Sequence, residues 1–307
     1  MRALLVVNHN ATTTNARSRD VLAHALRAEM DLEVAHTRRR GHAAELARKA
    51  ARDGVGVVVA LGGDGTVNEV VNGLLTDGPG PDVPALAVVP GGSTNVFARA
   101  MGLPRDPVEA TGVLLEALSE ERTRSIGLGR ADGRWFTFCA GLGLDAEVVR
   151  RVERARTRGK TATKYLYLRS TVSQYFSGTD RRSPLISLKQ PGGAPVEQLS
   201  MVIVQNTSPW TYFGTRAVNP SPDASFDTGL DVMAMRALHL PSTLRTAAQI
   251  LSASPDPHGR RVLRLHDLEE FTLTVERPLA VQVDGDYIGE RDEMVFQSEP
   301  NALRVLL

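Results

Sequence analysis

Hydrophobic and polar residues follow two different patterns along the chain, and the change comes near residue 122. Before it, short apolar runs such as Val55–Ala60 alternate with stretches in which apolar residues recur at helical spacing. After it, short strand-like stretches follow one another, separated by turns rich in Pro, Gly and Asp. The pattern therefore predicts two domains, at residues 1–124 and 125–299.

The first domain is predicted to be an α/β domain with a parallel sheet. Strands that alternate with helices imply right-handed crossovers and a sheet covered on both faces. The expected strands are Ala3–Val7, Leu32–His36, Val55–Ala60 and Ala85–Val89, and the expected helices are Ala16–Met30, His42–Arg52 and Val67–Leu75.

The second domain is predicted to be an antiparallel β-sandwich, because its strands are short and closely spaced. A helix is expected to open at Gly141–Asp145 and another at Pro241–Ser252. The closing strand Leu303–Leu307 fits either domain, and we favour its return to the first with residues 300–307. The expected strands of the second domain are Arg134–Phe138, Leu185–Lys189, Gln198–Gln205, Gly229–Met235, Arg261–His266, Phe271–Val275 and Leu279–Val283.

Polar or glycine-rich loops follow all four strands of the first domain. Ligands of open parallel sheets collect at the carboxyl ends of the strands. The loops that meet there contribute hydroxyls, amides, arginines and backbone N–H groups, which favours a nucleotide phosphate site. They are Asn8–Asn15, Thr37–Gly41, the Gly62–Thr66 turn and Pro90–Asn95.

The turn Gly62–Thr66 carries the strongest chemical signal. Glycines at a strand-to-helix turn let backbone N–H groups approach a phosphate where the helix dipole favours anions. Asp64 stands between them, and a carboxylate beside phosphates is repulsive unless a metal ion or a transferable proton intervenes. The simpler alternative is a tight turn whose Thr66 and Glu69 form a capping box.

Composition narrows the function classes. The 307 residues are 42% hydrophobic, and a net charge of +1 argues against nucleic-acid binding. The single cysteine, Cys139, excludes an internal disulfide and a cysteine-based zinc site. No apolar run approaches the roughly 20 residues of a membrane-spanning helix, and Met1–Val7 is strand-like. We expect a cytoplasmic enzyme, peripheral to the membrane, whose oligomeric state the sequence does not determine.

Two motifs, GGDGTVNEVVNGL at 62–74 and PGGSTNVFARAMGLP at 90–104, resemble the diacylglycerol kinase catalytic family, which includes bacterial soluble lipid kinases and sphingosine and ceramide kinases. The GGDG turn alone is shared with NAD kinases and phosphofructokinases, whereas the order and spacing of the whole set are specific to the lipid kinases. Further matches lie at 6–13, 138–146, 222–232 and 283–286.

The resemblance implies a nucleotide-binding α/β domain, a β-sandwich and an active site in the cleft between them. It implies ATP and Mg²⁺ as cofactors and a lipid hydroxyl at a membrane surface as acceptor, with diacylglycerol favoured. By the same resemblance, chemistry falls to Asp64, Asp284 and Asp286, and metal binding to Asp64, Asp223 and Asp227. The implied nucleotide-binding residues are Asn8, Asn10, Thr37, Gly62, Gly63, Gly65, Thr66, Glu69, Gly92, Ser93, Thr94 and Asn95.

The chain departs from the family pattern at four positions. Val96 and Gly127 stand where many bacterial members have aspartate, Asp286 stands where they have glutamate, and His9 replaces a proline. These changes leave the alternative that the protein is a catalytically weak homologue with a nucleotide-binding regulatory role. A kinase of NAD-kinase type, acting on a soluble substrate, is a second alternative, which Asn68-Glu69 and the loop at 90–95 disfavour.

Several acids also have purely structural interpretations. Asp284-Gly285 is a hairpin-turn signal, Asp223 and Asp227 fit an Asx-turn, and Asp145 fits a helix N-cap. The basic stretch at 150–164, followed by Tyr165–Leu168, fits either a membrane-facing segment or a solvated helix face followed by a core helix.

Overall fold

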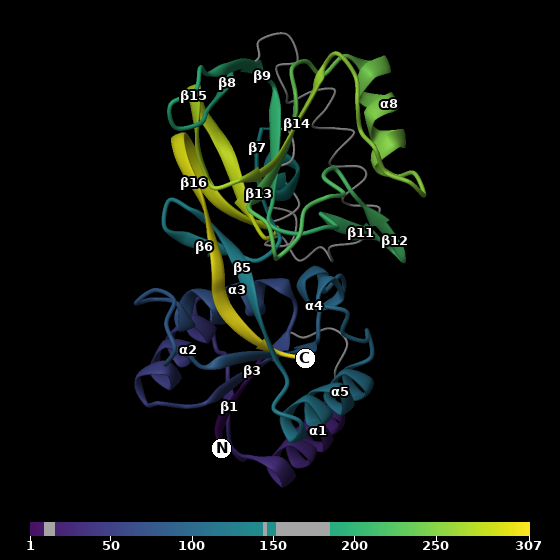
Figure 1. The fold of residues 1–307 in the computed structure, drawn as a ribbon. Coiled ribbons are helices and arrows are strands. Elements are labelled where there is room, and N and C mark those ends of the chain that lie inside the picture. Colours follow the sequence, from purple (N-terminus) through teal and green to yellow (C-terminus); the bar gives the residue numbers. More distant parts are fainter. Residues whose placement is uncertain (9–15, 144–145, 152–184) are drawn as a thin grey trace. The chain divides into compact units, whose positions relative to one another are not determined.

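The alternation of strand and helix in the first part of the sequence is present in the computed structural model (Figure 1). The structure describes residues 1–8, 16–143, 146–151 and 185–307. The chain divides into two compact units. Unit 1 contains residues 1–128 and 300–307, and unit 2 contains residues 129–299.

Unit 1 is built on a parallel sheet. Strand β1 pairs with β2 on one side and β3 on the other, and β3 pairs with β4. The end of β16 completes the sheet, since Val305 pairs with Leu86 in parallel. All six residues of β3 and of β4 are buried, as expected for strands covered on both faces. The strands are β1 Arg2–Val7, β2 Asp31–His36, β3 Val57–Gly62 and β4 Ala85–Pro90.

The helices of unit 1 include two that the apolar spacing did not predict, α4 and α5. Helix α5 has a clear start signal, because Asp106 Oδ1 accepts the backbone N–H groups of Val108 and Glu109 and Pro107 occupies the first turn. The helices are α1 Ala16–Glu29, α2 His42–Arg52, α3 Asp64–Leu74, α4 Val96–Ala100 and α5 Pro107–Ser119.

Unit 2 is an antiparallel β unit, so the predicted α/β-plus-antiparallel fold class is confirmed. Its strands run in the order β14-β13-β10-β7-β15-β16, with β8 beside β15 and β9 beside β8. Phe136, Phe271 and Phe296 are fully buried in its core, and the last two rings stack 5.1 Å apart.

The bounds in unit 2 are as follows. The strands on the main path are β7 Cys139–Gly143, β10 Met201–Gln205, β13 Leu230–Met235, β14 Val262–Leu268, β15 Glu270–Val283 and β16 Asp286–Leu306. The other strands are β5 Thr123–Ala131, β6 Arg134–Phe136, β8 Ile186–Lys189 and β9 Val196–Leu199, of which β5 begins in unit 1. Strands β11 Thr211–Phe213 and β12 Arg216–Val218 form a hairpin, and α8 is the helix Leu240–Ile250.

Three expectations for unit 2 were wrong in detail. Residues 139–143 form β7 instead of opening a helix, because this stretch pairs with both β10 and β15; residues 146–151 are helical. The single strand expected at Gln198–Gln205 is divided between β9 and β10, next to the left-handed Gln198. The two strands expected at 271–283 are one strand, β15, with a register shift between Thr274 and Leu279.

In the described part of the chain, no helix is long and apolar enough to span a membrane.

Candidate functional site

Four loops meet at one edge of the unit 1 sheet because the strands pair in register. Val7 lies opposite His36 and Leu61, and Gly62 lies opposite Pro90. Backbone hydrogen bonds continue past the strand ends: Thr37 N donates to Val7 O, Asn8 N to Leu61 O and Gly91 N to Gly62 O, at 2.9, 3.1 and 2.8 Å. The loops that begin at Asn8, Thr37, Gly63 and Gly91 therefore start side by side.

The two glycine-rich loops touch through their backbones. A Cβ atom built on Gly92 would lie 2.6 Å from Gly63 Cα and 2.8 Å from Asn95 Oδ1, and one built on Gly63 would lie 3.2 Å from Gly92 Cα. A Cβ on Gly62 would lie 2.5 Å from Thr66 Oγ1. Real Cβ atoms do not approach other atoms this closely, so the packing of the loops requires glycine at Gly62 and Gly92 and leaves little space at Gly63.

Asn95 fixes the shape of the second loop. Its side chain accepts the N–H of Gly92 and donates to the Gly92 carbonyl, both at 2.8 Å, while its backbone is left-handed with φ 52°. Asparagine tolerates this conformation better than most residues. The side chain is buried and committed to the loop, whereas Ser93 is exposed and Thr94 half-buried. The hydroxyls of Ser93 and Thr94 are thus the loop's accessible side-chain groups.

Helix α3 begins at Asp64, three residues before the expected start. Gly63 is its N-cap and offers no side chain, so the first-turn N–H groups of the helix have no cap from that residue. Thr66 lies within the first turn, and its hydroxyl accepts a 2.9 Å hydrogen bond from Asn8 Nδ2. This bond ties the loop after β1 to the glycine turn and brings the predicted residues Asn8 and Thr66 together.

Asp64 links the start of α3 to the start of α4. Its Oδ1 accepts the backbone N–H of Phe97 at 3.1 Å, and its side chain is only half-buried. Two helix N-termini therefore lie close to this carboxylate, and both favour negative charge. Val96, at the start of α4, is buried. The sequence does not predict that the Phe97 N–H contacts Asp64, because every residue except proline has a backbone N–H and its side chain does not indicate this contact.

The predicted capping box of Thr66 and Glu69 is wrong. Glu69 reaches away from its own helix and caps α2: Oε1 accepts Gly41 N at 2.8 Å and Oε2 accepts Ala43 N at 3.1 Å. Gly41, the N-cap of α2, has φ 82° and no side chain to do this. Both Glu69 oxygens are engaged, so Glu69 holds the end of the Thr37–Gly41 loop against α3.

Asp284 in unit 2 is enclosed and does not fit the predicted catalytic role. It is 5% exposed, and its carboxylate accepts four hydrogen bonds of 2.8 to 3.1 Å, from Thr137 N, Thr137 Oγ1, Phe138 N and Cys139 N. Burial raises the pKa of Asp284, and these donors oppose the rise. The side chain therefore anchors its turn to residues 137–139 and leaves no oxygen for a substrate.

The hairpin interpretation of Asp284-Gly285 is confirmed. The two residues connect β15 to β16 between the paired Val283 and Asp286, with φ of 47° and 79°. Positive φ at both positions is the requirement of a type I′ turn. Asp286, the third predicted catalytic residue, is half-buried at the start of β16.

The predicted metal pair Asp223 and Asp227 stays a prediction. Asp223 Oδ2 accepts from Arg264 Nη2 at 2.6 Å, and the Asp227 backbone N–H donates to Ser225 Oγ at 3.2 Å. Across residues 1–8, 16–143, 146–151 and 185–307, no group of three or more His, Cys, Asp or Glu side chains could hold a metal ion.

Some predicted residues lie outside the described ones, namely Asn10, Asp145 and the basic stretch from residue 152 onward. Of the described part of that stretch, Arg150 pairs with Glu147 at 3.1 Å and Glu290 at 2.7 Å. Cys139 is buried, as expected, and is not in a disulfide; Gln282 Nε2 donates to its Sγ at 3.5 Å.

Comparisons with known proteins agree with this arrangement. Residues 2–131 match the model of the diacylglycerol kinase catalytic domain. A diacylglycerol kinase of Bacillus subtilis is 27% identical over 259 residues, which are 81% of this chain and 77% of that protein. A diacylglycerol kinase of Staphylococcus haemolyticus is 35% identical over 129 residues, which are 42% of this chain and 37% of that protein.

Solved structures share the fold along the whole chain. A diacylglycerol kinase from Bacillus anthracis superposes with a TM-score of 0.73 at 19% identity, covering 99% of this chain and 96% of that one. An NAD kinase from Archaeoglobus fulgidus in complex with ATP reaches a TM-score of 0.51 at 12% identity, covering 100% and 94%. Residues 2–131 therefore match a diacylglycerol kinase catalytic domain, and the chain is similar in fold to these solved structures.

Proposed function

We propose that the chain transfers the γ-phosphoryl group of ATP to a lipid hydroxyl in a Mg²⁺-dependent reaction, with diacylglycerol as the favoured acceptor and phosphatidic acid as product. The observation that carries the proposal is the backbone contact between Gly63 and Gly92, with Asp64 directly after the first of these glycines. Two loops that meet at glycines, next to a carboxylate at a helix start, suit a triphosphate and its metal.

The nucleotide would be held mainly by backbone N–H groups. The N-terminus of α3 is not capped by a side chain of Gly63 and favours negative charge, and the hydroxyls of Ser93 and Thr94 lie on the neighbouring loop. Asn95 and Glu69 would act indirectly, because their side chains shape the loops. The proposed nucleotide set is therefore Asn8, Thr37, Gly62, Gly63, Gly65, Thr66, Gly92, Ser93 and Thr94.

The residues of the proposed site, with the Asp64 carboxylate beside them, are chemically suited to binding Mg²⁺ together with phosphate oxygens. Mg²⁺ keeps several waters and is commonly bound by one or two carboxylates together with substrate phosphates, so a cage of protein ligands is not required. Asp64 is a half-buried carboxylate with one oxygen accepting from Phe97 N. Asp64 would hold the ion, which would supply neutralising charge at the phosphates.

In the proposed reaction the lipid hydroxyl oxygen forms a bond to the γ-phosphorus while the bond from that phosphorus to the bridging oxygen of ADP breaks. The hydroxyl proton leaves to Asp64 or to water, so the products are ADP, the lipid phosphate and a proton. Because a lipid hydroxyl is a very weak acid, orientation and charge stabilisation matter more than early deprotonation. The main role of Asp64 would be to hold the Mg²⁺ ion that neutralises the negative charge of the γ-phosphoryl group.

The proposed acceptor class is supported by the match to a diacylglycerol kinase catalytic domain and by the names of similar proteins, which include diacylglycerol kinases. Asp286 would take part in the reaction only if it contacts the substrate. Asp284 would be a positioning residue, because it accepts hydrogen bonds from residues 137–139.

The test is a panel of lipid alcohols in mixed micelles with γ-labelled ATP and Mg²⁺, followed by organic extraction and chromatography. Label in phosphatidic acid from diacylglycerol is the expected result. Label in NADP after addition of NAD would support a kinase of NAD-kinase type instead. Nucleotide binding with no labelled lipid from any member of the panel would overturn the proposal in favour of a regulatory, non-catalytic protein.

A further inference from the structure

Helix α8 exposes its leucines and buries a threonine. Leu240 is 43% and Leu244 is 61% exposed, whereas Thr246 is 3% exposed and is the one buried residue of this helix. A helix that packs on a domain normally directs its large apolar side chains inward. The orientation of α8 therefore leaves an apolar row on the outside of unit 2.

The exposed row is continuous along the helix. Residues four, seven and eleven positions after Leu240 lie on the same helical face, and these are Leu244, Ala247 and Leu251. Ala247 is exposed and Leu251 half-buried. Another side of the helix attaches it to unit 2, since Ile250 packs against a core cluster that includes Met233.

Positive charge borders this row. Residues 236–264 contain five arginines and one acid, Asp256, although the whole chain has a net charge of only +1. The single acid is itself paired, because Asp256 Oδ1 accepts from Arg264 Nη1 at 2.8 Å. Arg261 and Arg245 both lie at α8: Arg261 Nη1 donates to Ser242 Oγ at 3.4 Å, and Arg245 is exposed on the helix.

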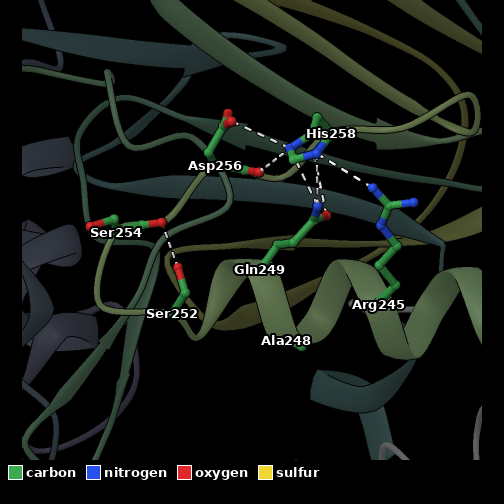
Figure 2. A pocket seen from close by; sticks show the side chains of 7 residues that line it. All are labelled: Arg245, Ala248, Gln249, Ser252, Ser254, Asp256 and His258. Carbon is green, nitrogen blue, oxygen red and sulfur yellow. Dashed lines mark hydrogen bonds and ion pairs between the residues drawn. The ribbon is translucent and has the colours of Figure 1, made fainter.

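Figure 2 shows the polar side of the same helix. Arg245 and Gln249 point toward the loop that carries Asp256 and His258, and Arg245 Nη2 lies 3.4 Å from His258 Nε2. Together with nearby serines they line a surface hollow of about 380 Å³. The hollow places a guanidinium beside the apolar row, where an anionic group can approach from solvent.

The hairpin β11–β12 carries a third exposed apolar side chain. Phe213, at its turn, is 54% exposed. Asn219 N, just after β12, donates to Ile250 O at the last residue of α8, so hairpin and helix are joined (Figure 1). Among the described residues, unit 2 has three exposed large hydrophobic side chains, and they are Leu240, Leu244 and Phe213.

We propose that α8, with the Phe213 hairpin, is a docking surface for an anionic membrane. A helix with leucines on one face and arginines beside them lies in the plane of the membrane interface, with its apolar face among the acyl chains and its cations at lipid phosphates. The inference rests on the proposed function only in that a lipid acceptor brings the enzyme to a bilayer. It assigns the docking to α8, outside the basic stretch at 150–164.

The test measures binding of the full chain to vesicles by sedimentation, using phosphatidylcholine vesicles with and without phosphatidylglycerol. The double variant Leu240→Ser/Leu244→Ser should lose at least about tenfold in binding to the anionic vesicles. Arg245→Gln should lose about fivefold on anionic vesicles and little on neutral ones. Val108→Ser is the matched control, since Val108 is 58% exposed on α5 in unit 1, and it should bind like the parent.

A second measurement reports contact directly. In Leu244→Trp, the indole emission should shift to shorter wavelength when anionic vesicles are added. Kinase activity of the double variant in detergent micelles should equal that of the parent. The micelle assay therefore tests the proposed kinase function, and vesicle sedimentation tests the docking surface. Parent-like vesicle binding by the double variant, no binding by the parent, or conversion of a dimer to a monomer by the substitutions would each overturn the proposal.

Discussion

Gly63 and Gly92 approach each other so closely that a Cβ atom on Gly92 would lie 2.6 Å from Gly63 Cα. The contact joins the loop after β3 to the loop after β4, and it places the start of α3 against the loop closed by Asn95. The relative position of these two loops is therefore fixed by backbone contact.

Gly92→Ala should separate the two loops and weaken nucleotide binding. Overpacking of this kind typically costs about 1–3 kcal/mol of stability. We expect ATP affinity, measured by calorimetry, to fall by at least about tenfold, equivalent to about 1.4 kcal/mol. Gly112→Ala on α5 is the control: a Cβ atom at this position would meet no atom within 4 Å beyond its own stretch of helix backbone, and alanine should stabilise this exposed helix site by about 1 kcal/mol. Unchanged ATP affinity in Gly92→Ala would contradict the proposed site.

Asp64→Asn should abolish most lipid phosphorylation while leaving the fold intact. The amide oxygen of asparagine can still accept the Phe97 N–H, but the negative charge is lost. We expect kcat to fall about 100-fold or more in the micelle assay, with unfolding in urea unchanged. Asp77→Asn, an exposed site shortly after α3, should behave as the parent. Equal turnover by Asp64→Asn and the parent would remove Asp64 from the chemistry.

Glu69→Gln should destabilise unit 1 through helix α2. Each oxygen of Glu69 accepts one backbone N–H at the start of α2, and the amide nitrogen of glutamine cannot replace one of them. Loss of one capping bond and of a charge at a helix N-terminus should cost about 1–2 kcal/mol. Urea unfolding measures this. Glu45→Gln, whose side chain pairs with Arg39 on the surface, is the control and should cost much less. A stability loss no larger than that of the control would contradict the capping role.

Asp284→Asn should change how stability depends on pH. Because burial raises the pKa of Asp284 above its ordinary value of 3.8, the native chain retains this proton where the unfolded chain has lost it. Stability should then fall as pH rises from about 4 through the raised pKa, by up to about 1.4 kcal/mol per pH unit. Asparagine suits the left-handed turn position and removes the charge.

The parent and Asp284→Asn are to be compared by urea unfolding across this pH range. The stability of the parent relative to the variant should decrease with increasing pH. If that difference instead increases with pH, the four hydrogen bonds to the carboxylate outweigh its burial, and the predicted direction is wrong.

The sheet of unit 1 could be predicted because its strands are apolar runs buried on both faces, as β3 and β4 are. The start of α3 could not, since Gly63 and Gly65 are poor helix formers, and the first turn is supported by neighbouring loops. Local sequence spacing suggested that Glu69 caps its own helix, but it caps α2, 26 to 28 residues earlier.

In unit 2, too, local sequence does not reveal structure that depends on residues distant in the sequence. Residues 139–143 contain glycines that suggested a turn into a helix, whereas pairing with β10 and β15 decides that they form a strand. The role of Asp284 depends on donors at residues 137–139, nearly 150 positions earlier. The hairpin itself was predictable, because a two-residue turn is a local signal.

Strand β16 has a consequence for the order of folding on the ribosome. Its last residues supply Val305 beside Leu86 and an Arg304 side chain that donates to Pro81 and Val83, so unit 1 is discontinuous in sequence. Unit 2 is one uninterrupted segment and can assemble as soon as it has left the exit tunnel. Unit 1, although synthesised first, keeps an open sheet edge at β4 until residues 300–307 emerge.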